Sequence, residues 1–126
     1  MASIKAQMLS ARMESEPALL VVDVREPEEF AIATIPGAAS APFDDDTAAR
    51  LAHLLGDRHR PVVFVCAWGH RAAIASIALR RQGFKDVSYL EGGLEAWGCA
   101  ALPVAAGNST LPLPAAPVSE RARFLD

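Results

Sequence analysis

The 126-residue sequence has only two cysteines, Cys66 and Cys99, and no long apolar run. Two cysteines cannot build a disulfide framework, and these two lack the paired spacing of a zinc site. The simplest interpretation is a reduced, intracellular protein, which we expect to be cytoplasmic. Charged residues interrupt positions 1–16, and no apolar stretch approaches membrane-spanning length. We therefore expect neither a signal peptide nor a membrane anchor.

Basic runs are absent as well. The formal net charge is −3, which argues against nucleic acid as the main partner and confines any anion site to a local pocket. Three consecutive aspartates at 44–46 are interpreted as a helix cap and an acidic turn, because no complementary metal ligands accompany them. We expect no metal and no cofactor. With 52% hydrophobic and 21% charged residues, the composition is that of a globular protein.

The apolar segments alternate between strand and helix character. The runs 61–65 and 18–24 are apolar without alternation, the second interrupted only by Asp23, which is typical of strands buried on both faces of a parallel sheet. Amphipathic or Ala-rich segments separate them, with short connections. The pattern predicts a three-layer α/β domain whose mainly parallel, five-stranded sheet has helices on both faces. The expected strands are 3–5, 18–24, 39–42, 61–65 and 87–90, and the expected helices are 6–13, a short one from 26, 48–56, 72–82 and 92–97.

The strongest functional signal is the segment 66–71, Cys-Ala-Trp-Gly-His-Arg, between a buried strand and a helix. Cys66 stands at the strand end, and Gly69 allows the backbone to curl. The amides of such a loop point towards the cysteine and, with Arg71, create a positive pocket that favours a thiolate and a neighbouring anion. Cys66 is the candidate nucleophile, and the candidate substrate-binding residues are Ala67, Trp68, Gly69, His70, Arg71 and Ala72.

Several of these side chains have alternative explanations. Arg71 binds an anionic substrate oxygen, holds the loop in shape, or is simply solvated at a helix start, where an arginine is disfavoured unless an anion lies nearby. His70 either adds positive charge at low pH or has no role. Trp68 either forms a lip for an acceptor or packs against Trp97 or the C-terminal segment. Cys99 is either a resolving thiol or incidental.

Four motifs in order resemble the rhodanese-like sulfurtransferases. The resemblance covers roughly residues 3–98, and the motifs are Leu20–Phe30, Ile35–Ala38, Cys66–Arg71 and Tyr89–Trp97. It implies the rhodanese-like fold and a thiosulfate sulfurtransferase in which Cys66 takes sulfane sulfur as a persulfide and passes it to cyanide or a thiol. The implied partners are a small anionic sulfur donor and a small nucleophile or thiol acceptor. A protein acceptor also fits.

The same resemblance assigns supporting residues around the loop. Asp23 and Arg25 would fix neighbouring loops, with Glu91 or Glu95 as possible ion-pair partners. Gly92 and Gly93 would allow close backbone approach. Family members commonly have histidine where this sequence has Thr34, which implies one weakened structural hydrogen bond.

Two other functions stay open. One is a sulfur-relay or regulatory binding module that passes its persulfide only to a partner protein. The other is an arsenate reductase or a phosphatase, although the five steps from Cys66 to Arg71 match the short loop of sulfurtransferases and related phosphatases have a longer one.

Composition changes near residue 98. Residues 1–98 are expected to form the rhodanese-like domain, and residues 99–126 a Pro/Ala-rich extension. The extension is too apolar for a linker, so we expect it to pack on the domain or on a neighbouring subunit. Residues 119–125 are expected to form one helical turn. His53 and His59 are interpreted as surface residues.

Overall fold

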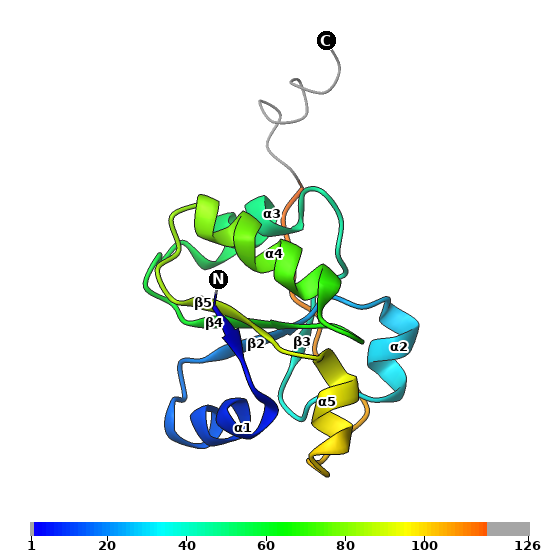
Figure 1. Cartoon of the computed structure of the whole chain (residues 1–126). Helices are drawn as coiled ribbons and strands as arrows, with labels where there is room; N and C mark the ends of the chain where they lie inside the picture. Colours follow the sequence, from blue (N-terminus) through cyan, green and yellow to red (C-terminus); the bar gives the residue numbers. More distant parts are fainter. Residues whose placement is uncertain (1, 116–126) are drawn as a thin grey trace.

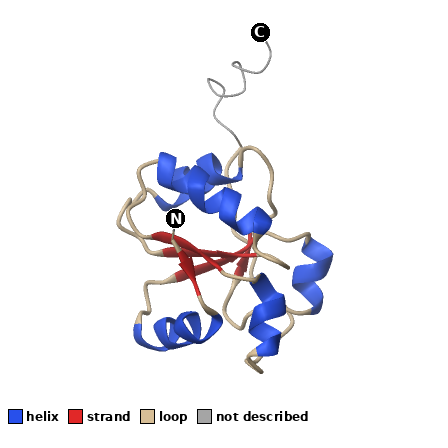
Figure 2. Ribbon diagram, viewed as in Figure 1, coloured by secondary structure: helices blue, strands red, loops and turns tan. Residues whose placement is uncertain are grey.

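The computed structural model describes residues 2–115, which form a five-stranded parallel sheet with helices on both faces (Figures 1 and 2). The strand order is β1-β5-β4-β2-β3, and every adjacent pair is parallel. The α/β fold predicted from the sequence is therefore confirmed. The elements in chain order are β1 (Ser3–Ile4), α1 (Ala6–Ser15), β2 (Leu20–Asp23), α2 (Pro27–Ile32), β3 (Ala39–Ser40), α3 (Thr47–Leu55), β4 (Val62–Val65), α4 (His70–Arg81), β5 (Val87–Leu90) and α5 (Gly93–Cys99).

Strand β4 lies at the centre of the sheet and connects the two hydrophobic cores. Its side chains alternate, so that Val62 and Phe64 belong to one core and Val63 and Val65 to the other. All four are fully buried. Burying each of them contributes about 1.5–3 kcal/mol to folding, which explains the unbroken apolar run.

The two helical layers are visible in Figure 1. Helices α3 and α4 cover one face of the sheet, and α1 and α5 cover the other. Leu51 and Leu79 anchor the first pair of helices in their core, while Leu9 and Trp97 anchor the second. This arrangement leaves the carboxyl ends of the strands at one common edge, where sites of parallel sheets form.

Several helix boundaries differ from the sequence prediction, among them the start of α4 and the end of α1. Helix α4 begins at His70 rather than at residue 72, because Gly69 provides a left-handed N-cap directly before it. Helix α1 extends to Ser15, where Arg12 pairs with Glu16 at 2.7 Å and with Asp86 at 3.2 Å. The hydrogen bond from Arg12 holds the pKa of Glu16 below its ordinary value.

Residues 100–115 run back across the domain. Thr34 and Ala105 exchange backbone hydrogen bonds, and the Ser40 amide donates to the Ser109 carbonyl at 2.8 Å. Leu111 then donates to the Ser40 carbonyl, which extends the sheet at its β3 edge. Contact with the domain was expected for this segment. The helical turn expected at 119–125 lies outside the described residues.

Candidate active site

Cys66 lies at the carboxyl end of β4, where the chain turns into α4. Its side chain is buried, with only 1% of the residue exposed. The sulfur accepts two backbone hydrogen bonds, from the Gly69 amide at 3.1 Å and from the Ala72 amide at 3.4 Å. Two dipoles thus point their positive ends at Sγ, an arrangement that stabilises negative charge on this atom.

The tight loop depends on Gly69. Its φ of +111° lies in a region that side chains disfavour, so a glycine is needed for the chain to turn within three residues. The turn brings the Gly69 amide back over Sγ and starts α4 immediately afterwards. The Ala73 amide then donates to the Gly69 carbonyl at 2.9 Å, which fixes the loop to the first helical turn.

Helix α5 clamps the loop from the other side. The Leu94 amide donates to the Cys66 carbonyl at 2.8 Å, and the Glu95 amide donates to the Ala67 carbonyl at 3.2 Å. Gly93 has a φ of +62°, and a Cβ at this position would overlap the carbonyl oxygens of Cys66 and Ala67. The close approach expected at Gly93 is therefore present. Sequence reasoning missed the two amides of Leu94 and Glu95, for which the Gly-Gly pair was the only signal.

Arg71 lies in the first turn of α4, beside the loop. Its guanidinium is 4.0 Å from the carboxylate of Glu29, and both side chains are partly exposed. Glu29 also accepts a hydrogen bond from the Glu26 amide as part of the capping box of α2. This acidic partner was not expected from the sequence. The partial exposure of Arg71 leaves its guanidinium accessible to an anion at the loop, with which the Glu29 carboxylate competes.

Trp68 and His70 both face solvent. Trp68 is 66% exposed, while Trp97 is buried and donates from Nε1 to the Pro103 carbonyl at 2.8 Å. The alternative in which Trp68 packs into the protein is therefore wrong. An exposed tryptophan beside a buried cysteine is available to contact whatever molecule approaches the loop.

Asp23 and Arg25 form a buried ion pair at the end of β2, with Arg25 Nη2 2.8 Å from the Asp23 carboxylate. Thr34 donates its hydroxyl proton to the same carboxylate at 2.8 Å, and Arg25 also donates to the Ala33 carbonyl. The loop before β3 is thus tied to β2, as expected for a supporting pair. Thr34 supplies a buried hydrogen bond at the position where one was expected to weaken.

The expectation that Glu91 or Glu95 pairs with Arg25 is wrong. Glu91 accepts a hydrogen bond from the Ser3 hydroxyl at 3.4 Å, and Glu95 lies 3.9 Å from Cys99 Sγ. Both glutamates follow β5, on the other side of the central strand from β2, so neither approaches Arg25. Cys99 is exposed at the end of α5.

Other candidate features lie away from the loop. His53 and His59 are exposed, as expected. Within residues 2–115, no three His, Cys, Asp or Glu side chains come together in a way that would hold a metal ion. The longest helix of this part of the chain, α4, has 12 residues, and none of the helices has the length and apolar character needed to cross a bilayer.

The family model of the rhodanese-like domain matches residues 5–99. The chain belongs to the rhodanese-like family. This confirms the resemblance drawn from the four sequence motifs, and the matched range includes the whole strand, loop and helix around Cys66.

Named relatives of this rhodanese-like chain include sulfurtransferases. It is 37% identical over 87 residues to "Thiosulfate sulfurtransferase GlpE" of Pseudomonas aeruginosa, which covers 69% of this chain and 76% of the relative. It is 35% identical over 103 residues to a "Sulfurtransferase" of Allochromatium vinosum, covering 82% and 94%. The solution structure of the rhodanese-like domain of Anabaena protein Alr3790 matches with a TM-score of 0.73 at 31% identity, covering 93% and 89%.

Proposed function

We propose that the chain is a sulfurtransferase that moves sulfane sulfur from thiosulfate, or a related donor, to a thiophilic acceptor through a persulfide on Cys66. The observation that carries this proposal is the pair of amides, from Gly69 and Ala72, directed at the buried Sγ. The names of the two sulfurtransferase relatives support the same reaction class.

The first step is nucleophilic. The Cys66 thiolate attacks the outer sulfur of thiosulfate, the sulfur–sulfur bond of the donor breaks, and sulfite leaves with the bonding electrons. The two amides stabilise the thiolate before the attack and the persulfide anion after it. Arg71 is placed beside the loop to hold the sulfonate oxygens of the donor, because a guanidinium binds such oxygens through paired hydrogen bonds.

The second step restores the thiolate. A nucleophile such as cyanide or a thiolate attacks the terminal sulfur, the persulfide bond breaks, and the electrons return to Cys66 Sγ. No metal ion or redox partner takes part in this sequence. Since Cys66 is almost completely buried, only a small or slender group reaches its sulfur.

The deciding experiment measures the intact mass of the protein after incubation with thiosulfate, followed by a thiocyanate assay after cyanide is added. We expect a gain of one sulfur atom that is absent in Cys66→Ser, and thiocyanate release from the wild-type protein alone. Failure of every sulfane donor tested to add sulfur would overturn the proposal. Cys99→Ser is the matched control, because this exposed cysteine lies outside the loop and its variant should behave as wild type.

Arg71→Ala tests whether the Arg71 guanidinium binds the anionic sulfur donor. We expect the KM for thiosulfate to rise by at least about tenfold, since a charge-assisted contact is worth roughly 1.5–3 kcal/mol. The thermal unfolding midpoint should change little, because Arg71 is partly exposed. An unchanged KM would contradict the role.

A further inference from the structure

One face of helix α4 leads away from the reactive loop. His70, Ile74, Ile77 and Arg81 follow the spacing i, i+4, i+7 and i+11, which places them in one stripe along the helix. His70 and Arg81 are exposed, Ile77 is half-buried, and Ile74 is 55% exposed. We call these four residues the α4 face. Its first residue directly follows the loop that holds Cys66, and this loop also contains exposed Trp68.

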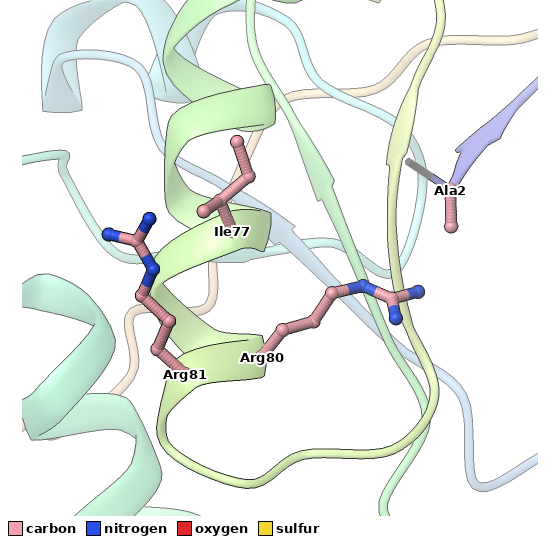
Figure 3. A pocket seen from close by; sticks show the side chains of 4 residues that line it. All are labelled: Ala2, Ile77, Arg80 and Arg81. Carbon is pink, nitrogen blue, oxygen red and sulfur yellow. The ribbon is translucent and has the colours of Figure 1, made fainter.

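A cavity of about 660 Å³ lies at the far end of the α4 face, lined by Ala2, Ile77, Arg80 and Arg81. Figure 3 shows Arg80 reaching from the helix across to β5, on the side of Ala2, whereas Arg81 lies on the other side of the helix. Arg80 is held in this position by its hydrogen bond to the Val87 carbonyl. From His70 to Arg81 the helix rises roughly 16 Å, at about 1.5 Å per residue.

The charge of α4 differs from that of the whole chain. The chain has a formal net charge of −3, yet the helix contains three arginines and no acidic residue. Within residues 2–115, no carboxylate lies within 4.0 Å of the guanidinium groups of Arg80 and Arg81. These two cations therefore remain available to an acidic partner, and exposed Ile74 and half-buried Ile77, between them and the loop, provide apolar contact area.

We propose that the α4 face docks an acidic, amphipathic segment of a thiol-bearing protein, which receives sulfur from Cys66. This inference rests on the proposed function, because it names the kind of acceptor that the persulfide serves. One acidic side chain meets Arg81 and a second meets Arg80 at the adjoining cavity, while apolar side chains cover Ile74 and Ile77. The thiol lies at the loop before His70, which is about 16 Å along the helix from Arg81. Charge complementarity steers the encounter, and the apolar stripe fixes its register.

The transfer step is balanced without an oxidant or a reductant. The acceptor thiolate attacks the terminal sulfur of the Cys66 persulfide, and a new sulfur–sulfur bond forms on the acceptor. The bond between that sulfur and Sγ breaks, and its electrons return to Sγ, where the Gly69 and Ala72 amides stabilise the thiolate. The acceptor leaves as a persulfide.

Apolar side chains distinguish this partner from nucleic acid. A phosphate backbone would be attracted by the arginines, but it makes no use of a stripe of aliphatic groups. Ile74 and Ile77 occupy the middle of the face, so a protein segment with both acidic and apolar side chains matches its chemistry better.

Two helical peptides test the proposal. Each carries a cysteine near one end and leucines along one face; one has two glutamates about eleven residues from the cysteine, and the other has glutamines there. With the cysteine replaced by serine and a dye attached, binding to the protein is measured by anisotropy at low salt. We expect the glutamate peptide to bind at least about tenfold more tightly, and the difference to shrink as salt is added.

Variants locate the binding surface. Arg81→Gln and Ile74→Ser should each weaken binding of the glutamate peptide by at least about threefold, because each removes one contact from the docking surface. Lys5→Gln removes one exposed charge from a different cavity, formed with α1 and α5, and should leave binding unchanged. Equal affinity of the two peptides, or equal effects of all three variants, would overturn the proposal. So would tighter binding of a single-stranded oligonucleotide.

The cysteine forms of the peptides then report sulfur transfer. The ratio of transfer rates to the glutamate peptide and to uncharged dithiothreitol should fall in Arg81→Gln and stay at the wild-type value in Lys5→Gln. Since the serine peptides measure docking without any chemistry, the two proposals can fail separately. A protein that takes no sulfur from thiosulfate but still prefers the glutamate peptide overturns the proposed function and supports the surface.

Discussion

The hydroxyl of Thr34 donates a hydrogen bond to the carboxylate of Asp23 at 2.8 Å, in the interior of the protein. Arg25 donates to the same carboxylate through Nε and Nη2, at 3.1 and 2.8 Å. The Arg25 backbone amide donates to it as well, at 2.9 Å, so four donors from two different segments surround the buried negative charge at the end of β2. This contact joins the loop before β3 to the strand that neighbours β4 and its reactive cysteine.

Replacing Thr34 by valine should therefore destabilise the fold. The substitution keeps the shape of the side chain but removes one donor from a buried carboxylate, which costs about 1.5–3 kcal/mol. Urea unfolding monitored by circular dichroism measures this loss. Thr34→Ser keeps the hydroxyl and should cost no more than about 1 kcal/mol, the value of one buried methyl group. Equal stability of the valine variant and the wild type would show that the hydrogen bond contributes nothing.

Gly93→Ala should disrupt the reactive loop. The residue has a φ of +62°, and its new methyl group would overlap the carbonyl oxygens of Cys66 and Ala67. We expect a loss of more than about 2 kcal/mol in unfolding free energy, from backbone strain and overpacking together. Persulfide formation, measured by intact mass, should fall in the same variant, because the hydrogen bonds that the Leu94 and Glu95 amides donate to the loop would be disrupted.

Gly98 provides the matched control for this prediction. It lies in the same helix, α5, and a Cβ there would meet no atom within 4 Å. Gly98→Ala should therefore be neutral or stabilising by up to about 1 kcal/mol, since alanine is the better helix former. Similar behaviour of the two variants would contradict a special role for Gly93.

Local patterns explain why the sheet and the loop could be predicted from the sequence. The apolar run before Cys66 indicates burial on both faces of β4, and Gly69 followed by an Ala-rich segment indicates a tight turn into a helix. These features are encoded by neighbouring residues, so the central part of the candidate site could be derived without a structure. The resemblance to the family additionally indicated which segments, distant in the sequence, lie around this loop.

The remainder depends on contacts between segments that are far apart in the chain. Glu29 meets Arg71 because α2 lies beside the start of α4, and no periodicity in either segment predicts that meeting. The wrong pairing of Arg25 with Glu91 has the same origin, because the order of strands decides which charges are neighbours. The path of residues 100–115 could not be predicted from the sequence either, because it is fixed by isolated backbone hydrogen bonds rather than by a repeating pattern.

Glu29→Gln should strengthen binding of the anionic donor. The substitution removes a negative charge 4.0 Å from the Arg71 guanidinium, while the amide oxygen can still accept the hydrogen bond from the Glu26 amide. Two unit charges at this separation interact by about 1 kcal/mol in water, so the KM for thiosulfate should fall by up to about fivefold with little change in kcat. Glu28→Gln, on the exposed side of the same helix, is the control. A KM that falls equally in both variants would point to general charge rather than to Arg71.

Gly107→Ala tests how firmly the C-terminal segment is attached to the domain. The Gly107 amide donates to the Phe30 carbonyl at 3.1 Å, and a Cβ on Gly107 would overlap both that carbonyl and the aromatic ring of Phe30. Since Phe30 is buried and has little freedom to move, we expect a loss of about 1–3 kcal/mol in urea unfolding. Asn108→Ala, at the exposed neighbouring position, should stay within about 0.5 kcal/mol of wild type. If both variants match the wild type, the segment moves away from Phe30 without any loss of unfolding free energy. Its contacts with α2 and β3 then do not contribute to the stability of the fold.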